Sequence, residues 1–317
     1  MPARDPARLP YGLAVDSDTA PAPYSGPASP PAPDDRFTFA LISDRTGAAR
    51  PGVFERGIAA LNLLAPTFAF QMGDLVEGYT EDTATLDAEW AEVDAILAPL
   101  RVPLFHVPGN HDVANAVMRE RWLSRYGALH YHVRYRDTFF LVLDTQDPEQ
   151  PMPPEDAARL RARLAAADGD PELTRQAYEA AVDWNGVPRA AGLSEQQLAY
   201  AEQVLRDNTD VRWTFVIMHM PLWQGEGHPA YHRIRAALGD RPHTMFAGHV
   251  HNYRVTEIDG NRCIRLGPTG GVWVFGDGHP GNIDHVTLVT VGAPGTDEPV
   301  IANLTLDGIL GPEGSPV

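Results

Sequence analysis

Acidic, amide and imidazole side chains recur in this chain, each at the end of an apolar segment. In chain order they are Asp44, Asp74, Asn110, His219, His249 and His251. Two carboxylates, one amide and three imidazoles form a mixed oxygen and nitrogen donor set without sulfur. Such a set favours a borderline metal such as Mn, Fe or Zn over Mg or Ca, which prefer shells made of oxygen alone. The residue types therefore predict a metal site if the fold brings them together.

Glycine precedes several of these candidate ligands. The motifs are Gly73-Asp74, Gly109-Asn110-His111-Asp112 and Gly248-His249-Val250-His251. Glycine lets the backbone turn sharply, so that the next side chain points over the edge of a sheet. One Asp or His after an apolar run is usually an ordinary turn or cap residue. Together with Asp44 and His219, the three motifs make five signals in order, which are hard to reach by chance and favour a shared metal site.

The apolar segments themselves predict buried strands. They span 37–44, 67–74, 103–112, 139–145, 213–219 and 243–251. Between them, the apolar spacing is helical over 53–64 and again after a Ser194-x-x-Gln197 capping box. Strands that alternate with helices indicate an α/β domain. In open α/β sheets ligands collect outside the carboxyl ends of the strands, so the candidate ligands should converge there.

Composition divides the chain into a domain, an inserted segment and two ends. Residues 1–34 form a Pro-rich arm, with nine prolines among the first 33 residues, and we expect it to be extended and poorly packed. The folded domain spans 35–312, and 313–317 form a tail. Within the domain, 147–192 opens on four prolines and continues with Ala- and Arg-rich helical segments, which predicts an inserted helical subdomain. After Gly260 the pattern returns to β, including the segment 271–276.

The ordered motifs resemble those of the calcineurin-like metallophosphoesterases. In that family the blocks run Asp-x-His, Gly-Asp-x-x, Gly-Asn-His-Asp/Glu, His and Gly-His-x-His, and the resemblance covers about residues 37–255. It implies a four-layer α/β/β/α sandwich, in which two facing mixed sheets are flanked by helices and the site lies at one end. It also implies two metal ions bridged by Asp74. One would be completed by Asn110, His219 and His249, and the other would be held by Asp44 and His251.

Two metals suit the hydrolysis of a phosphoester. Phosphoryl oxygens repel nucleophiles, and two metals about 3.5 to 4 Å apart bind those oxygens and activate a bridging water. No protein nucleophile is needed, so the remaining requirement is a charge stabiliser or a proton donor toward the leaving oxygen. The resemblance places His111 beside the scissile phosphate, next to Asn110, which suits this role. We therefore predict a metal-dependent hydrolase whose catalytic residues are Asp74 and His111.

One position departs from the family pattern. Thr46 stands where the family has a metal-binding His. A threonine hydroxyl is a poor ligand, so the Asp44/His251 site binds its metal weakly, is completed by a residue from elsewhere, or is empty. A weaker site offers less positive charge, which slightly favours a singly charged phosphodiester over a dianionic monoester. The alternative is a metal-binding regulatory or interaction protein that has the same fold and weak or no turnover.

Substrate specificity is expected in segments beside the predicted site that we interpret as loops. These segments are 77–88, 147–192 and 220–240. The candidate substrate contacts are Arg45, Thr46, Trp223 and His228. Because 147–192 is too long for a simple connection, we expect it to act as a lid or as a homo-oligomerisation element.

The overall charge restricts the partners. Lys+Arg 25 against Asp+Glu 42 gives −17, which disfavours bulk binding of nucleic acid or an anionic membrane. Bound metal would still attract a small phosphoester. No stretch approaches the ~18 to 20 consecutive apolar residues of a membrane helix, and residues 1–10 lack an apolar signal-peptide run. The single cysteine, Cys263, supplies no disulfide framework, and we expect a cytoplasmic enzyme.

Overall fold

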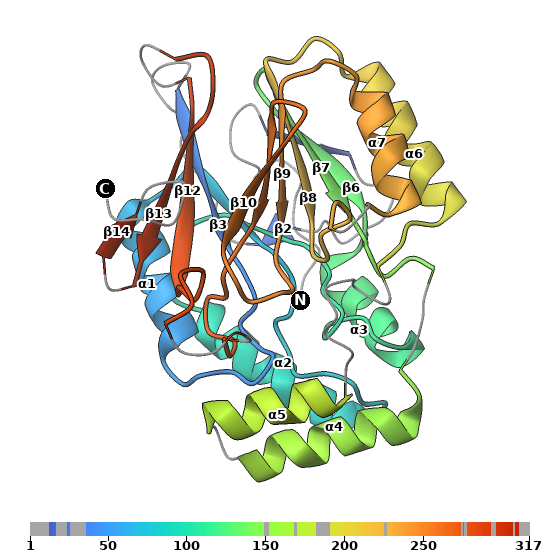
Figure 1. The fold of residues 1–317 in the computed structure, drawn as a ribbon, viewed down its shortest axis with the longest axis vertical. Helices are drawn as coiled ribbons and strands as arrows, with labels where there is room; N and C mark the ends of the chain where they lie inside the picture. The colour runs from blue at the N-terminus through green and yellow to red at the C-terminus, as the bar shows by residue number, and fades with distance from the viewer. Residues whose placement is uncertain are drawn as a thin grey trace.

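The fold is described from a computed structural model of the chain. It describes residues 13–16, 24–25, 36–148, 152–167, 170–181, 191–224, 227–273, 275, 278–292, 296–306 and 308–310. Within these residues the chain forms two seven-stranded sheets that face one another (Figure 1).

The first sheet has the strand order β1-β6-β7-β8-β9-β11-β10. Its strands are β1 Leu13–Asp16, β6 Tyr131–Tyr135, β7 Thr138–Leu143, β8 Trp213–Met218, β9 His243–Ala247, β10 Arg254–Ile258 and β11 Asn261–Arg265. β7, β8, β9 and β11 run parallel to one another. β1 pairs antiparallel with β6, β6 with β7, and β10 with β11. The carboxyl ends of β8 and β9 therefore lie at the same edge.

The second sheet has the order β14-β13-β12-β3-β4-β5-β2. Its strands are β2 Tyr24–Ser25, β3 Phe37–Ile42, β4 Phe68–Gln71, β5 Leu104–His106, β12 His285–Val291, β13 Val300–Thr305 and β14 Gly308–Leu310. β3, β4 and β5 are parallel, and the other pairs are antiparallel. The carboxyl ends of three neighbouring strands thus also meet at one edge.

Aromatic side chains fill the space between the two sheets. Phe39 of β3 stands edge-on to Phe140 of β7 and Phe215 of β8, with ring centroids 5.0 and 4.8 Å apart. All three rings are fully buried. Each buried aromatic side chain removes about 150–250 Å² of surface from water, and burial of apolar surface stabilises the folded state by about 25 cal/mol per Å². This burial holds the sheets face to face and so fixes the distance between their edges.

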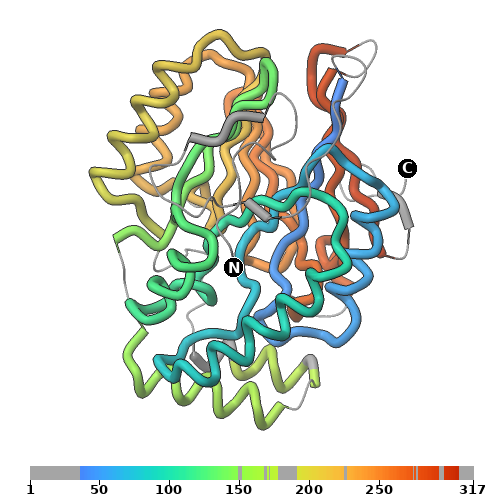
Figure 2. The backbone as a smooth tube through the Cα atoms, turned by 180° about the vertical axis from the view of Figure 1, so that it is seen from behind, coloured from blue at the N-terminus to red at the C-terminus, as the bar shows by residue number. Residues whose placement is uncertain are grey.

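Helices cover both outer faces of the sandwich (Figures 1 and 2). The helices are α1 Val53–Leu64, α2 Thr83–Leu97, α3 Ala116–Tyr126, α4 Pro154–Ala167, α5 Pro171–Ala181, α6 Glu195–Asp207 and α7 Pro229–Leu238. The first three pack on the β3–β5 sheet and α6 and α7 on the β7–β9 sheet, each pair of layers sharing a buried apolar cluster. The predicted α/β/β/α sandwich of two mixed sheets is confirmed.

Local sequence signals account for several helix positions. In α1 the buried residues Val53, Phe54, Ile58 and Leu61 lie on one face at helical spacing. At α6 the predicted cap is present, since the Ser194 hydroxyl accepts a hydrogen bond from the Gln197 amide at 3.2 Å. All six predicted apolar strands form, as β3, β4, β5, β7, β8 and β9.

Two parts of the secondary structure differ from the sequence interpretation. Segments 77–88 and 220–240 are not wholly loops, because α2 begins at Thr83 and α7 spans Pro229–Leu238. The β pattern expected over 271–276 is wrong for its described part, which contains no strand. Its apolar residue Val272 is instead buried against Leu160 of α4. The apolar pattern predicted a strand here because Val272 is buried, but it is buried against a helix that lies far away in the sequence.

The predicted arm and insertion each contain described elements. β1 and β2 lie in 1–34 and pair with β6 and β5, so these two short segments are part of the sheets. The rest of the arm and the tail 313–317 lie outside the described residues. α4 and α5 lie in 147–192 and pack together at one end of the molecule (Figure 2). Among the described residues no helix is both long and apolar enough to cross a bilayer.

Candidate metal centre

The predicted ligands follow strands of both sheets at one end of the sandwich. Asp44 follows β3, Asp74 follows β4, and Asn110 lies in the segment after β5. In the facing sheet, His219 follows β8 directly, and His249 and His251 lie in the turn after β9. The sheet order brings these strand ends together, because β3, β4 and β5 are neighbours and β8 pairs with β9.

Four of these residues have left-handed backbone conformations. Their φ angles are 34° for Asp44, 59° for Asp74, 70° for His249 and 52° for His251. A non-glycine residue in this region costs about 1 kcal/mol or more, and such residues cluster at functional sites. The strain is maintained here at the positions that carry the candidate donor atoms.

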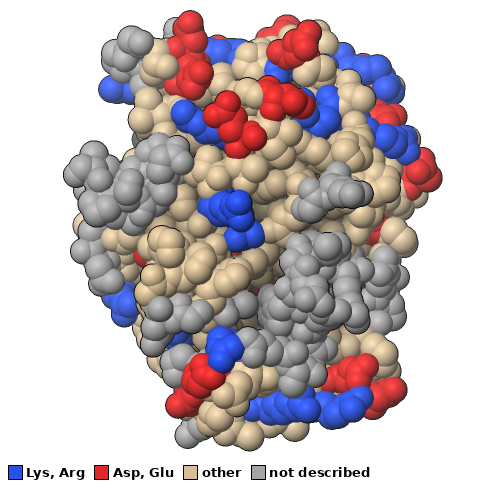
Figure 3. Space-filling view, in the orientation of Figure 1, with Lys and Arg blue, Asp and Glu red and all other residues tan. Residues whose placement is uncertain are grey.

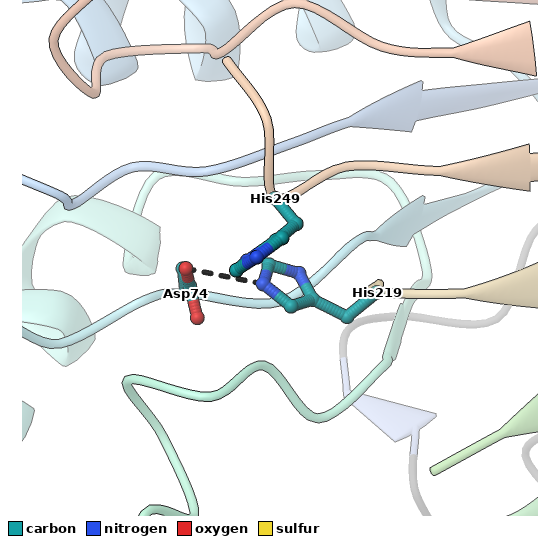
Figure 4. Close-up of side chains that lie close together, drawn as sticks. All are labelled: Asp74, His219 and His249. Atoms are coloured by element: carbon teal, nitrogen blue, oxygen red, sulfur yellow. Dashed lines mark ion pairs between the residues drawn. The ribbon is translucent and has the colours of Figure 1, made fainter. Parts of the chain in front are cut away.

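Asp74, His219 and His249 form one donor group. One ligand atom from each lies within 4.8 Å of the other two, and their side chains point toward a common centre (Figure 4). His219 Nε2 is 3.1 Å from Asp74 Oδ2 and 2.9 Å from Asn110 Oδ1. A Cβ on Gly73, which has φ 98°, would lie 2.4 Å from the His219 ring, so only glycine permits this approach.

The orientation of His219 suits a cation. Its Nδ1 lies 2.7 Å from the Met72 carbonyl, which can only accept, so Nδ1 carries the proton of the neutral ring. Nε2 then directs its lone pair at the oxygens of Asp74 and Asn110. These acceptors repel one another unless a proton or a metal ion lies between them. The donor chemistry therefore fits a metal bound by oxygen and nitrogen.

Asp44, Asp74 and His251 form a second donor group with the same 4.8 Å separation. His251 Nδ1 lies 2.5 Å from the Val272 carbonyl, and Nε2 lies 3.3 Å from Asp44 Oδ1. The Asp44 carboxylate also accepts hydrogen bonds from the His249 amide at 3.0 and 3.2 Å. Both groups share Asp74, as the sequence interpretation requires of a bridging ligand.

Burial and neighbouring charges together shift the pKa values of the donor residues. Burial alone would raise the pKa of Asp74, but His219 and His111 outweigh it and hold that pKa well below its usual range. Burial would lower the pKa of His219, and the charge of Asp74 instead raises it to about 9. Burial and the neighbouring His219 lower the pKa of His249 to about 3. A metal binds the ionised carboxylate and the neutral imidazole, so metal binding here would displace the proton that Asp74 holds on His219.

Comparison with known proteins decides the family. The family model of the calcineurin-like phosphoesterases matches residues 37–253, which is more than half of the chain. The chain belongs to the calcineurin-like phosphoesterase family. It is a metallophosphoesterase, an enzyme that hydrolyses phosphoesters with the help of metal. A search of curated proteins found no match.

Solved structures share the fold of this phosphoesterase. A dimetal phosphatase from Danio rerio is 16% identical, with 88% of this chain and 99% of that chain covered and a TM-score of 0.60. A purple acid phosphatase from yellow lupin (Lupinus luteus) is 14% identical, with coverage of 90% and 55% and a TM-score of 0.57. A PhoD structure is 13% identical, with coverage of 90% and 73% and a TM-score of 0.55. At these identities the likeness establishes the fold.

Asp112 holds the loops of the phosphoesterase centre together. Its buried carboxylate accepts hydrogen bonds from the amides of Asp74, Leu75 and Gly109 at 2.7, 2.8 and 2.9 Å. Burial and the charge of Asp74 raise its pKa to about 7. The sequence interpretation quoted Asp112 in the Gly109–Asp112 motif but gave it no role. Its position in that motif was the only available signal.

His111 lies beside the shared carboxylate. Its amide donates to Asp74 Oδ1 at 2.9 Å, and its Nδ1 lies 2.8 Å from the Glu77 carbonyl. The ring of Tyr79 packs edge-on against it, with centroids 4.7 Å apart. Sequence reasoning did not identify Tyr79, which belongs to none of the motifs.

Thr46 is buried in the loop that carries Asp44. Its amide donates to the Asp74 carbonyl at 3.1 Å, whereas its hydroxyl is buried without a hydrogen-bond partner in the described part of the chain. Next to it, a Cβ on Gly47 would lie 2.5 Å from the ring of His251. The loop that carries Thr46 therefore packs closely on the second donor group.

The other candidate substrate contacts have structural partners. Arg45 is buried, and its guanidinium donates to the Leu75 carbonyl at 2.8 Å and pairs with Glu92 of α2. Trp223 is buried in the apolar cluster under α6 and α7. His228 is the N-cap of α7, with Nδ1 accepting from the Ala230 amide at 3.1 Å. Their spacing in sequence did not reveal these packing roles.

Proposed function

We propose that this phosphoesterase binds two metal ions through the two donor groups and hydrolyses a small phosphoester. The observation that carries the proposal is the shared carboxylate of Asp74, which belongs to both groups. Asn110, His219 and His249 complete the first site, and Asp44 and His251 hold the second. Mn, Fe or Zn suits this mixed donor set. When bound, the metals supply positive charge to the phosphoryl oxygens and lower the pKa of a water nucleophile.

The residues of the chain orient these groups and manage the proton. The Met72 and Val272 carbonyls fix the rings of His219 and His251, so that each presents Nε2 to the centre. The Glu77 carbonyl engages His111 Nδ1, so proton exchange at this ring takes place at Nε2. We propose that His111 donates a proton or a hydrogen bond to the leaving oxygen.

The second site has fewer protein donors than the first, and this bears on the substrate. Thr46 offers only a hydroxyl where an imidazole is expected, so we propose that the Asp44/His251 site binds its metal more weakly. Less positive charge at the centre slightly favours a singly charged phosphodiester over a dianionic monoester. A small substrate also fits the net charge of −17. On the face in Figure 3, acidic and basic side chains are interspersed, for example at the end with α4 and α5.

Metal analysis combined with hydrolysis assays tests the proposal. The purified protein is stripped with a chelator, reloaded with Mn²⁺, Fe²⁺ or Zn²⁺, and assayed with bis(p-nitrophenyl) phosphate and p-nitrophenyl phosphate. We expect hydrolysis that depends on metal, with a higher kcat/KM for the diester. A higher kcat/KM for the monoester would reject the diester preference. Metal binding without hydrolysis of either ester would favour the regulatory alternative.

A further inference from the structure

Tyr79 contacts both Asn110 and His111. Its hydroxyl lies 2.7 Å from Asn110 Nδ2, and its ring packs edge-on against the ring of His111. Tyr79 has φ 48°, a strained conformation for an aromatic residue. The side chain is therefore held against a proposed metal ligand and the proposed proton donor at the same time.

The contact with Asn110 engages the nitrogen end of its amide, the end that does not ligate metal. A carboxamide has one oxygen and one nitrogen end, and only the oxygen binds a metal. Here Nδ2 donates to the Tyr79 hydroxyl, while Oδ1 lies 2.9 Å from His219 Nε2 on the side of the donor group. Rotation of the amide would place an N–H group where the ligand oxygen belongs. Accepting the Nδ2 hydrogen bond therefore stabilises the orientation that binds metal.

Helix α4 of the inserted segment holds the loop that carries Tyr79. The guanidinium of Arg161 binds the Gly78 carbonyl and pairs with Glu89 at 3.0 Å. Glu89 in turn accepts a hydrogen bond from the Gly78 amide at 2.9 Å. Leu160 of α4 belongs to a small apolar cluster against which Tyr79 packs. Both polar groups of the Gly78 backbone are thus tied, directly or through α2, to α4.

The same loop presses on the backbone of His111. A Cβ on Gly78, which has φ 56°, would lie 1.9 Å from the His111 carbonyl oxygen. This close approach leaves no room for a side chain. A shift of the Gly78–Tyr79 segment would therefore also displace His111 and Asn110. α4 and the centre are therefore connected through two adjacent residues.

We propose that Tyr79 is a positioning residue for Asn110 and His111, and that the inserted helix α4 keeps it in place through Arg161 and Leu160. The insertion then acts on the metal centre itself. The proposal rests on the proposed function, because it assumes that Asn110 Oδ1 ligates metal. It gives the 147–192 segment a role at the site whatever its part in subunit association.

The first test is Tyr79→Phe, which keeps the ring and removes the hydroxyl. Mn²⁺ and Zn²⁺ affinities are measured by competition with a chromophoric chelator. We expect the Asn110-side site to bind metal about 10-fold more weakly, the scale of losing a group that orients a ligand, while the other site is unchanged. Tyr200→Phe is the matched control, because its hydroxyl bonds His132 of β6 at 2.8 Å and neither residue belongs to a donor group. It should leave both affinities unchanged.

The second test compares two arginines of α4. Arg161→Gln removes the contacts with Gly78 and Glu89, whereas Arg159→Gln alters an exposed arginine that pairs with Asp156 on the same helix. We expect Arg161→Gln to weaken the Asn110-side site in the same direction as Tyr79→Phe, and the control to leave it unchanged. The double variant should lose less than the sum of the single losses, since both changes act through one loop.

The outcomes separate this proposal from the proposed function. Wild-type protein that binds no metal would overturn the proposed function and this inference together. Wild-type binding and hydrolysis, with unchanged metal affinity in both Tyr79→Phe and Arg161→Gln, would overturn the inference alone. A lower melting temperature with unchanged metal affinity also contradicts it, because the loop would then be structural only. If Tyr79→Phe does not fold, the pair Arg161→Gln and Arg159→Gln decides.

Discussion

The metal centre has two sides, which we name after Asn110 and Thr46. The Asn110 side comprises Asn110, His219 and His249, the Thr46 side comprises Asp44 and His251, and Asp74 is shared. Both sides orient their ligands by hydrogen bonds, but they carry different donors. On the Asn110 side, Met72 orients His219 and Tyr79 orients Asn110. On the Thr46 side, Val272 orients His251, and the loop closes on that ring at Gly47. The Thr46 hydroxyl is nevertheless buried and without a hydrogen-bond partner among the described residues.

This difference shows that the backbone conformation of the centre does not depend on the number of strong donor side chains that it carries. Both sides keep ligand residues in left-handed backbone conformations, with φ 70° at His249 on the Asn110 side and 34° at Asp44 on the Thr46 side. Such strain persists only where the surrounding structure imposes it. The backbone of the Thr46 side is therefore as strictly specified as that of the Asn110 side, although one side chain offers a weaker donor.

Replacing the shared ligand Asp74 should abolish metal binding on both sides of the centre. Asp74→Asn removes an ionised carboxylate from both donor groups. We expect both metals to be lost and kcat/KM to fall about 1,000-fold or more, because bound metal provides several kcal/mol of transition-state stabilisation. Metal content by mass spectrometry and diester hydrolysis measure the effect.

The matched control is Asp144→Asn. Asp144 is also a buried carboxylate just after a strand, but it pairs with Arg119 at 2.8 Å and belongs to neither donor group. It should keep both metals. Retention of two metals in Asp74→Asn would contradict a shared ligand and leave two independent sites.

His111→Asn should separate proton donation from metal binding on the Asn110 side. The variant keeps a polar side chain but loses the ring nitrogen that exchanges a proton. We expect metal content to persist while kcat falls about 100-fold, the scale of general acid catalysis. The loss should shrink for a diester with a good leaving group, which needs little protonation. An equal loss for good and poor leaving groups would assign His111 another role.

Thr46→His should make the two sides more alike. It adds the imidazole that the family pattern has at this position, so we expect the affinity for the second metal to rise about 10-fold. Thr46→Val, which replaces the hydroxyl with a methyl group of similar size, should leave metal binding unchanged. Equilibrium dialysis with Mn²⁺ gives the two affinities. Two equal, tight sites in the wild type would show that another group already completes the second site.

The smallest expected effect concerns the loop that supports His251. His285 Nε2 accepts a hydrogen bond from the Gly267 amide at 3.0 Å, and the Thr269 hydroxyl donates to the His285 carbonyl at 2.8 Å. Burial lowers the pKa of His285 to about 4, whereas in the unfolded chain it is about 6.5. The unfolded state therefore binds the proton more tightly, and stability is lost as pH falls from about 7 toward 4.

Urea unfolding at several pH values measures this dependence. Between pH 7 and pH 6 the expected loss from His285 is about 0.7 kcal/mol. His285→Gln, which can still accept from Gly267 but does not titrate, should show a correspondingly flatter pH dependence than the wild type. Parallel curves for the two proteins would contradict the assignment to His285.

Many features of the fold and centre were predictable because they depend on local patterns. Short apolar runs followed by Asp, Asn or His specify buried strands and the residues at their ends. Parallel neighbours present their carboxyl ends at one edge, so the sequence alone places Asp44, Asp74 and His219 together with their partners. The cap at Ser194 is likewise local, since its partner lies only three residues away.

Other roles depend on residues far apart in the chain. Arg45 and Trp223 were candidates for substrate contact, but they are bound or packed by α2 and by the α6–α7 layer. Segment 271–276 had the composition of a strand, yet Val272 packs against α4, more than 100 residues earlier in the chain. Such contacts depend on how complete layers pack, which no short pattern specifies.

The sequence by itself determined the donor types, their order along the chain and the strands that carry them, because periodicity and glycine motifs act over a few residues. Only the tertiary structure decided how each donor is oriented. Carbonyls of Met72 and Val272 select the free nitrogen of each imidazole, Asp112 ties three loop amides together, and Tyr79 fixes one amide. These hydrogen bonds form only when segments from both sheets and the insertion are packed at one end of the sandwich, since their geometry depends on distances that the packed core sets.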